Sequence, residues 1–299
     1  MSRRSWLLFA AMCVIWGVPY LMIRVAVREV SPGTLVFART ALGALLLLPI
    51  AIRRDALRPV LRLWRPLLVY SAFEVAAPWL LLSDAETKLS SSLTGLLIAA
   101  VPLVGVALAR IQGTDDPVDA WRALGLLLGI GGVVALLGLD VGELHAGPLV
   151  EVGAVVICYA LGPVIFSRYL SGVPAMGVVV LSLAICAVGY LPAAVVEPPK
   201  HLPANVVWSV IGLATICTAL AFILFFALIA DIGPARSTVI TYVNPAVAVL
   251  LGVALLGEQF TAGMAVGFPL ILIGSVLAAR KRTVRETAAP TPIAEPAPS

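Results

Sequence analysis

Two ionisable residues lie inside long apolar runs of this sequence, where a charged side chain is costly and a functional role is the first hypothesis. Glu74 stands between Phe73 and Val75, and Arg39 lies about two helical turns into another run. A carboxyl group among apolar atoms is more stable neutral than ionised, so Glu74 could carry a coupling proton. Arg39 could pair with Glu74, bind an anionic group of a substrate, or extend to the membrane interface. The alternative for Glu74 is a paired or permanently protonated group that only holds helices together.

Several polar and aromatic residues share helix faces with Glu74 or with one another. Helical spacing puts Ser71 on the same face as Glu74 and turns Trp79 about 140° away, which leaves Trp79 out. Trp16 and Tyr20 lie on one helix face, so their rings could stack on a planar or cationic substrate, or pack against neighbouring helices. Further candidates to line a substrate path are Tyr159, Thr215, Thr218, Tyr242 and Asn244.

Two prolines, Pro102 and Pro245, interrupt apolar runs and leave backbone carbonyl groups without helical partners. Broken helices of this kind occur at substrate sites and hinges of transporters, so both prolines are candidate hinges. His145 and His201 lie in separate loops, and the cysteines are dispersed singly. We therefore expect no metal, no cofactor and no catalytic residues. The sequence also lacks the glycine-rich motif of ATP-binding proteins.

The elements that must position these residues are membrane-spanning helices. Of the 299 residues, 61% are hydrophobic and 12% are charged, and the mean hydropathy is +1.06. This composition excludes a soluble enzyme, a disordered chain and a nucleic-acid-binding protein. The apolar runs are continuous rather than alternating, which favours helices of about 20 residues over barrel strands. We predict ten spans, at residues 5–24, 33–52, 64–83, 90–110, 120–139, 147–169, 174–196, 205–229, 234–256 and 261–279.

The lysines and arginines between the spans orient the chain in the membrane. If the N-terminus is cytoplasmic, fifteen of these residues fall on the cytoplasmic side and four, Arg24, Arg28, Lys88 and Lys200, on the outer side. Cytoplasmic loops carry the excess of basic residues, so this distribution supports an even number of spans with both termini inside. We expect a multi-pass protein of a bacterial plasma membrane, whose positive net charge reflects topology rather than an anionic partner.

Residues of unusual type recur at a spacing of 142 to 144 residues along the chain. The matched pairs include Pro19 with Pro163, Pro32 with Pro174, Trp64 with Trp208, Pro102 with Pro245 and Gly125 with Gly267. The same spacing matches Glu74 with Thr218. Each half has five spans, an odd number, so the second half enters from the opposite side of the bilayer. Such inverted repeats allow a protein to alternate between inward-open and outward-open states around a central substrate site.

Two glycine pairs, Gly125 with Gly129 and Gly263 with Gly267, each have the spacing that lets helix backbones approach closely. They lie in the fifth and tenth predicted spans. The sequence leaves open whether these helices pack within one subunit or between subunits.

The N-terminal half contains Trp16-Gly17, with Arg24 eight residues after the tryptophan. This motif is similar to the WG…K opening of the EamA-type transporters of the drug/metabolite transporter superfamily, with arginine in place of the more usual lysine. Pro32 followed by Arg39 is similar to its P…R signature. The family carries this basic residue across substrates of different charge. The resemblance therefore favours a gating or structural ion pair for Arg39 over substrate contact.

The C-terminal half carries the closing motif of the same family. Pro245 followed by Gly257-Glu258 resembles the P…GE end of an EamA repeat, whereas residues 112–116 of the first repeat read QGTDD where GE is expected. We expect Glu258 to cap the helix at 261–279 through its backbone amides. The resemblance implies secondary transport of small metabolites, often outward.

Together these observations predict an all-α polytopic membrane protein with ten transmembrane helices arranged as two inverted five-helix repeats. The first repeat covers residues 1–142, the second covers 143–282, and residues 283–299 form a disordered cytoplasmic tail. The expected function is export of a small organic metabolite or drug-like compound, with protons as a candidate coupling ion. An uncoupled facilitator or channel and a lipid-modifying membrane enzyme are the alternatives. The expected partners are the substrate and the lipid bilayer, and the oligomeric state stays open.

Overall fold

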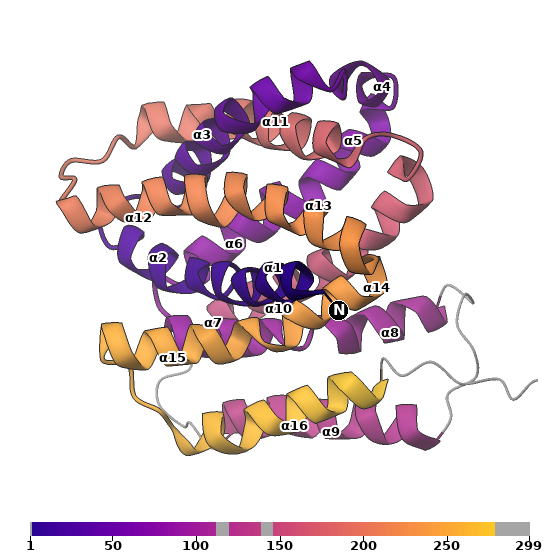
Figure 1. Cartoon of the computed structure of the whole chain (residues 1–299). Helices are drawn as coiled ribbons and strands as arrows, with labels where there is room; N and C mark the ends of the chain where they lie inside the picture. The colour runs from indigo at the N-terminus through magenta and orange to yellow at the C-terminus, as the bar shows by residue number, and fades with distance from the viewer. Residues whose placement is uncertain (1, 112–119, 139–145, 279–299) are drawn as a thin grey trace, which may run out of the picture.

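The computed structural model describes residues 2–111, 120–138 and 146–278, and these residues form helices and connecting turns without any strand (Figure 1). The first half contains α1 (Arg3–Ile15), α2 (Val18–Ala26), α3 (Pro32–Arg53), α4 (Leu57–Leu61), α5 (Trp64–Ser71), the π-helix η1 (Ala72–Ala76), α6 (Ala77–Ala85), α7 (Ser91–Ile98), α8 (Val101–Ile111) and α9 (Ala120–Gly138). The second half contains α10 (Ala146–Ile165), the π-helix η2 (Phe166–Leu170), α11 (Ala175–Val196), α12 (Ala204–Ala214), the π-helix η3 (Thr215–Leu220), α13 (Ala221–Ile232), α14 (Pro234–Ser237), the 3-10 helix η4 (Thr238–Tyr242), α15 (Asn244–Leu256) and α16 (Ala262–Ala278).

Within the described ranges, nine helical segments are long and apolar enough to cross a membrane. They coincide with the first nine predicted spans. The tenth predicted span coincides with α16, which is apolar but has only 17 residues. The chain is therefore an all-helical, multi-pass membrane protein, while the count of ten and the inverted relation remain predictions. The predicted tail at 283–299 and the boundary between residues 142 and 143 lie outside the described residues.

The helices pack in pairs that relate the two halves of the chain. α3 lies along α11, α7 along α15, and α9 along α16, so the second, fourth and fifth spans each contact the equivalent span of the other half. α1 and α2, the first span, lie along α13 and α12, which belong to the eighth. α6 of the third span lies along α10 of the sixth. In the repeat, the first span is equivalent to the sixth and the third to the eighth. The contact between the first and eighth spans is therefore equivalent to that between the sixth and third, so the contacts follow a two-fold pattern.

In the described ranges, several spans are broken by a turn, after which a proline opens the next helix. Pro19, Pro102 and Pro245 each occupy the second position of a helix, in α2, α8 and α15 respectively. Proline is tolerated there because the first amides of a helix have no helical acceptor. Both candidate hinges, Pro102 and Pro245, thus lie just after breaks in their spans, and their hinge role stays a prediction.

Glycines let α9 and α16 lie in backbone contact (Figure 1, bottom). A Cβ atom at Gly125 would lie 2.5 Å from the backbone nitrogen of Ala278, and one at Gly132 would lie 2.7 Å from that of Ile271. A Cβ atom at Gly267 would lie 2.7 Å from the carbonyl oxygen of Gly132. These distances are too short for any larger residue without movement of a helix. Gly125 and Gly267 of the predicted motifs therefore serve a contact within the chain.

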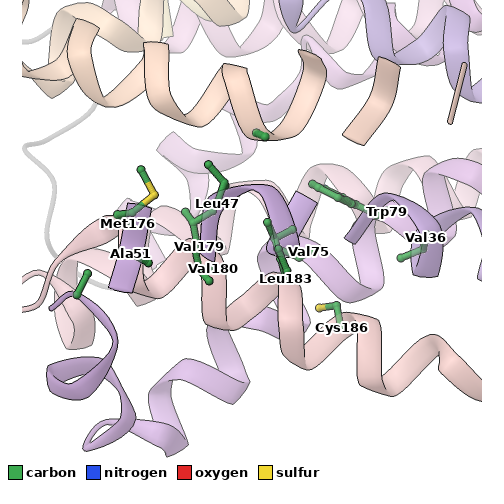
Figure 2. Packing of buried hydrophobic residues seen from close by; sticks show 13 residues of the cluster. Val36, Leu47, Ala51, Val75, Trp79, Met176, Val179, Val180, Leu183 and Cys186 are labelled. Carbon is green, nitrogen blue, oxygen red and sulfur yellow. The ribbon is translucent and has the colours of Figure 1, made fainter. Parts of the chain in front are cut away.

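An apolar cluster fixes the third span between α3 and α11 (Figure 2). Leu47 of α3, Val75 of η1 and Trp79 of α6 pack with Leu183 and Cys186 of α11. All five side chains are buried. This packing positions α6, and with it the ring of Trp79, beside the polar residues of the bundle interior.

Candidate functional site

Arg39 is buried on α3 and is held by residues of the third and eighth spans. Its Nε donates a hydrogen bond to Oγ1 of Thr218 at 3.0 Å, and its Cζ lies 3.6 Å from the centre of the Trp79 ring. The face of an indole ring attracts a cation, so Trp79 stabilises the guanidinium group. Helical spacing within one span excludes Trp79 from the face of Glu74. The contact between Trp79 and Arg39 joins two helices, so spacing within one helix cannot predict it.

Glu74 and Thr218 both lie in π-helical turns, at positions that the sequence repeat relates. η1 begins at Ala72, and η3 begins 143 residues later at Thr215. Within η3 the hydroxyl of Thr218 donates to the carbonyl oxygen of Leu213 at 2.8 Å while it accepts from Arg39. π-Turns inside α-helices are frequent at functional sites. The repeat predicts that these two positions are equivalent, but it does not predict the π geometry.

Glu74 extends from η1 to α10. A Cβ atom at Gly162 would overlap Oε2 of Glu74 and lie 2.9 Å from its Cδ, so the carboxyl group fills the space that a larger residue would need. Oε2 is buried and has no hydrogen-bond partner in the described part of the chain. Glu74 and Arg39, both of which the structure describes, form no ion pair with each other.

Two tyrosines connect these charged groups. Tyr159 of α10 is within electrostatic range of both Arg39 and Glu74, and it packs against the apolar clusters that contain Trp79 and Tyr20. Tyr20 of α2 is buried and within electrostatic range of Arg39 and Tyr159. We call Tyr20, Arg39, Glu74, Trp79, Tyr159 and Thr218 the central cluster. Sequence reasoning selects all of its members except Trp79.

Three of the predicted path residues have other contacts. The ring of Trp16 lies 4.7 Å from that of Phe225 on α13, centre to centre, so Trp16 belongs to an aromatic contact between α1 and α13. The hydroxyls of Ser71 and Thr215 each donate to the carbonyl oxygen four residues earlier in their own helix, at 2.7 Å. Their donors are thus already used inside the third and eighth spans.

Tyr242 and Asn244 lie where η4 passes into α15. Tyr242 ends η4 and is half-buried, whereas Asn244 is buried. With its amide nitrogen oriented as the donor, Asn244 bonds to the carbonyl oxygens of Ile240 at 2.9 Å and Cys13 at 3.0 Å. Asn244 therefore faces protein and ties the ninth span to α1.

Glu258 binds the N-terminus of α7, whereas the sequence predicts it at the N-terminus of α16. Its Oε1 accepts from the backbone nitrogen and Oγ of Ser91 at 2.8 and 2.9 Å, and its Oε2 accepts from those of Ser92 at 2.9 and 2.5 Å. Burial acts to raise the pKa of Glu258, but these donors outweigh burial and lower it below its usual value. Glu258 thus caps a helix, as expected for its residue type. That helix is α7, which is distant in sequence, so the residues near Glu258 do not indicate it.

Glu86, which sequence reasoning missed, directly follows α6 and is completely buried. Neither carboxylate oxygen has a hydrogen-bond partner among the described residues. Arg24 of α2 donates to the backbone carbonyl oxygen of Glu86 rather than to its carboxylate. In the sequence, Glu86 stands between Asp84 and Lys88, a pattern typical of a hydrated loop, so no signal there marks it as buried.

The central cluster combines a cation, a carboxyl group and three aromatic rings inside an apolar bundle. Such a set can bind a planar or charged organic group and can exchange a proton. Across the described residues, no three His, Cys, Asp or Glu side chains are grouped to hold a metal ion.

Comparison with known proteins places this chain in a family. The model of the EamA-like transporter family matches residues 4–138 and 152–280. YedA of Escherichia coli K12, named an uncharacterized inner membrane transporter, is 28% identical over 84% of this chain and 82% of its own length. An uncharacterized transporter of Archaeoglobus fulgidus is 23% identical over 93% of this chain and all of its own length.

A chain of known crystal structure has a similar fold, with a TM-score of 0.65 and 20% identity over 92% of this chain and 96% of that one. The similarity supports the fold alone. The family and the names of the relatives point to a transporter rather than an enzyme, in agreement with the apolar helices and the paired halves. This chain belongs to the EamA-like transporter family.

Proposed function

We propose that this protein is a secondary active transporter that exports a small organic compound across the plasma membrane, with protons as the coupling ion. One observation carries the proposal. Arg39 and Glu74 lie in the same bundle interior, both within electrostatic range of Tyr159, yet they do not pair in the described structure. Two ionisable groups held apart in this way can respond to a proton or a substrate.

A neutral Glu74 accounts for the observed contacts. An ionised carboxylate without hydrogen-bond donors would be costly between apolar helices, whereas a neutral carboxyl group is tolerated. A neutral Glu74 does not attract Arg39, whose guanidinium group contacts Trp79 and Thr218 instead. Loss of the proton would create a carboxylate that attracts the guanidinium group. Proton release at Glu74 and the position of Arg39 are then linked, which is the requirement for coupling.

The packing of the two halves supports alternating access. The two-fold pattern of helix contacts fits an inverted repeat, in which the halves exchange conformations to open one side or the other. The helix breaks before Pro102 and Pro245 supply equivalent hinges in the fourth and ninth spans. The excess of basic residues on one side supports cytoplasmic termini.

The rings of Tyr20, Trp79 and Tyr159 favour a substrate with a planar group, because aromatic stacking provides binding without a fixed charge. The predicted path residues Trp16, Ser71, Thr215 and Asn244 make structural contacts in this conformation, and Tyr242 is half-buried at the end of η4. Their participation would therefore require the helices to move. Tyr159 is the best-placed substrate contact, since it packs against both apolar clusters of the interior.

Counterflow in proteoliposomes tests the proposal. Vesicles are loaded with one unlabelled compound from a panel of amino acids, nucleosides and cationic drugs, and a trace of the labelled compound is added outside. A carrier should show trans-stimulated uptake that Trp79→Ala weakens. Trp208→Ala, at a tryptophan 68% exposed, is the matched control and should leave uptake unchanged. If uptake is the same with and without the unlabelled compound inside the vesicles, the protein acts as a channel.

A further inference from the structure

The carboxyl group of Glu86 is a second buried acid, which is not a member of the central cluster. Glu86 has no exposed surface, and both of its carboxylate oxygens lack hydrogen-bond partners in the described part of the chain. The structure places four donors on the carboxylate of Glu258 nearby and none on that of Glu86. The four donors stabilise an ionised Glu258, whereas no hydrogen bond among the described residues stabilises an ionised Glu86.

The charged and titratable groups around Glu86 come from several elements. Among the described residues, those within electrostatic range are Tyr20 and Arg24 of α2, Arg39 of α3 and Glu258 of the turn before α16. Glu151 of α10 interacts with Asp84 and Lys88 instead. Arg24 and Arg39 favour an ionised Glu86, whereas Glu258 opposes it.

Burial dominates this balance and raises the pKa of Glu86 well above its usual range, against the effect of Arg24. The guanidinium group of Arg24 bonds to the main chain of Glu86 and leaves the carboxyl group unpaired. A buried carboxyl group without hydrogen-bond donors favours its neutral form, and it releases its proton more readily when water reaches it.

The helices around Glu86 are closed against one another. α2, α7 and α15 are in mutual contact. A Cβ atom at Gly95 of α7 would lie 2.6 Å from Cβ of Ala248 on α15 and 3.5 Å from Cδ2 of Tyr20 on α2. Only glycine allows these three helices to meet so closely, and their contact keeps water from the neighbourhood of Tyr20.

We propose that Glu86 is a second proton-binding site of this transporter, neutral while α2, α7 and α15 are closed and deprotonated when this end of the bundle opens to water. On opening, the O–H bond of the carboxyl group breaks, the proton passes to water and the electron pair stays on the carboxylate. Arg24, which already donates to the backbone carbonyl oxygen of Glu86, is the cation that we expect to pair with the new carboxylate. The protonation of Glu86 is argued from its surroundings alone, and only the role of this proton in transport rests on the proposed function.

Infrared spectroscopy of the purified protein tests the protonation state without a substrate. A neutral carboxyl group has a C=O stretching band that an ionised carboxylate lacks. At neutral pH, Glu86→Gln should reduce the intensity of this band relative to the wild type. Glu29→Gln, at an exposed side chain, is the matched control and should leave the intensity unchanged. An E86Q spectrum with the wild-type intensity would overturn the proposal.

Glu86→Asp gives a second test in case the glutamine variant does not fold. It retains a carboxyl group in the same closed surroundings, so the band should persist at a shifted frequency. A band that neither shifts nor weakens would show that it arises elsewhere, and would also overturn the proposal.

The same measurements separate this proposal from proton coupling through Glu74. If E86Q loses band intensity while Glu74→Gln leaves the pH dependence of transport intact, the proton site at Glu86 stands and coupling through Glu74 fails. If E74Q abolishes that dependence while E86Q keeps the wild-type band, the reverse holds.

Discussion

Replacing Glu258 by alanine tests how strongly the turn before α16 is fastened to α7. The substitution removes four hydrogen bonds and leaves the hydroxyls of Ser91 and Ser92, both completely buried, without an acceptor. Loss of a helix cap costs about 0.5–2 kcal/mol, and each buried donor left unsatisfied costs about 1–3 kcal/mol. Because Glu258 is only partly buried, these terms do not add in full. We expect the free energy of unfolding to fall by about 3 kcal/mol.

Thermal unfolding of the purified protein, followed by circular dichroism, measures this loss. A change of about 3 kcal/mol should lower the midpoint by about 6–12 °C in a chain of this size. Glu29→Ala, at an exposed glutamate, serves as the control and should leave the midpoint unchanged. A midpoint for E258A within about 2 °C of the wild type would refute the reasoning.

A double-mutant cycle assigns the effect to the contact itself. Ser92→Ala removes a hydroxyl that donates to Glu258. It should therefore destabilise the wild type more than it destabilises E258A, because the second background has already lost the acceptor. Equal costs in the two backgrounds would mean that the contact does not contribute.

The pH dependence of stability follows from the same carboxylate. Its pKa is lower in the folded protein than in the unfolded chain, so its stabilising contribution is complete above the unfolded value. That contribution is lost as the pH falls through the folded value. Midpoints of wild type and E258A measured between neutral and acidic pH should converge in acid, and a constant difference would contradict this assignment.

Two glycine substitutions have matched controls in the same helices. Gly125→Ala should destabilise the protein by about 2 kcal/mol or more because its Cβ would meet the backbone of α16, whereas Gly131→Ala, which has nothing within 4 Å, should have little effect on the unfolding midpoint. Gly162→Ala should reduce transport in proteoliposomes because its Cβ would displace the carboxyl group of Glu74, whereas Gly153→Ala, also with open space around it, should not. Similar results for a substitution and its control would refute either prediction.

The first nine spans could be predicted from the sequence because each depends on the local run of apolar residues. The predicted repeat, read from equivalent residues that keep their order, agrees with the paired helix contacts. The same repeat anticipated that the positions of Glu74 and Thr218 are related. Their π-helical geometry was not accessible, since one extra residue in a helical turn leaves no mark on composition.

The contacts of the candidate site depended on which helices lie side by side, and the spacing within one helix does not contain that information. Ideal helical spacing turns Trp79 away from Glu74, yet its ring contacts Arg39 of α3. Glu258 has the expected capping role on a helix from the other half of the chain. Glu86 stands in a short polar segment of the sequence, but its side chain is completely buried in the folded bundle.

The most direct test of proton-coupled transport is flux driven by a pH gradient in proteoliposomes, once counterflow has identified a substrate. The wild type should accumulate the substrate in response to the gradient. Glu74→Gln, which cannot release a proton, should lose this response and still exchange substrate across the membrane. An E74Q variant that keeps the wild-type dependence on pH would contradict the assignment of Glu74 as the coupling site.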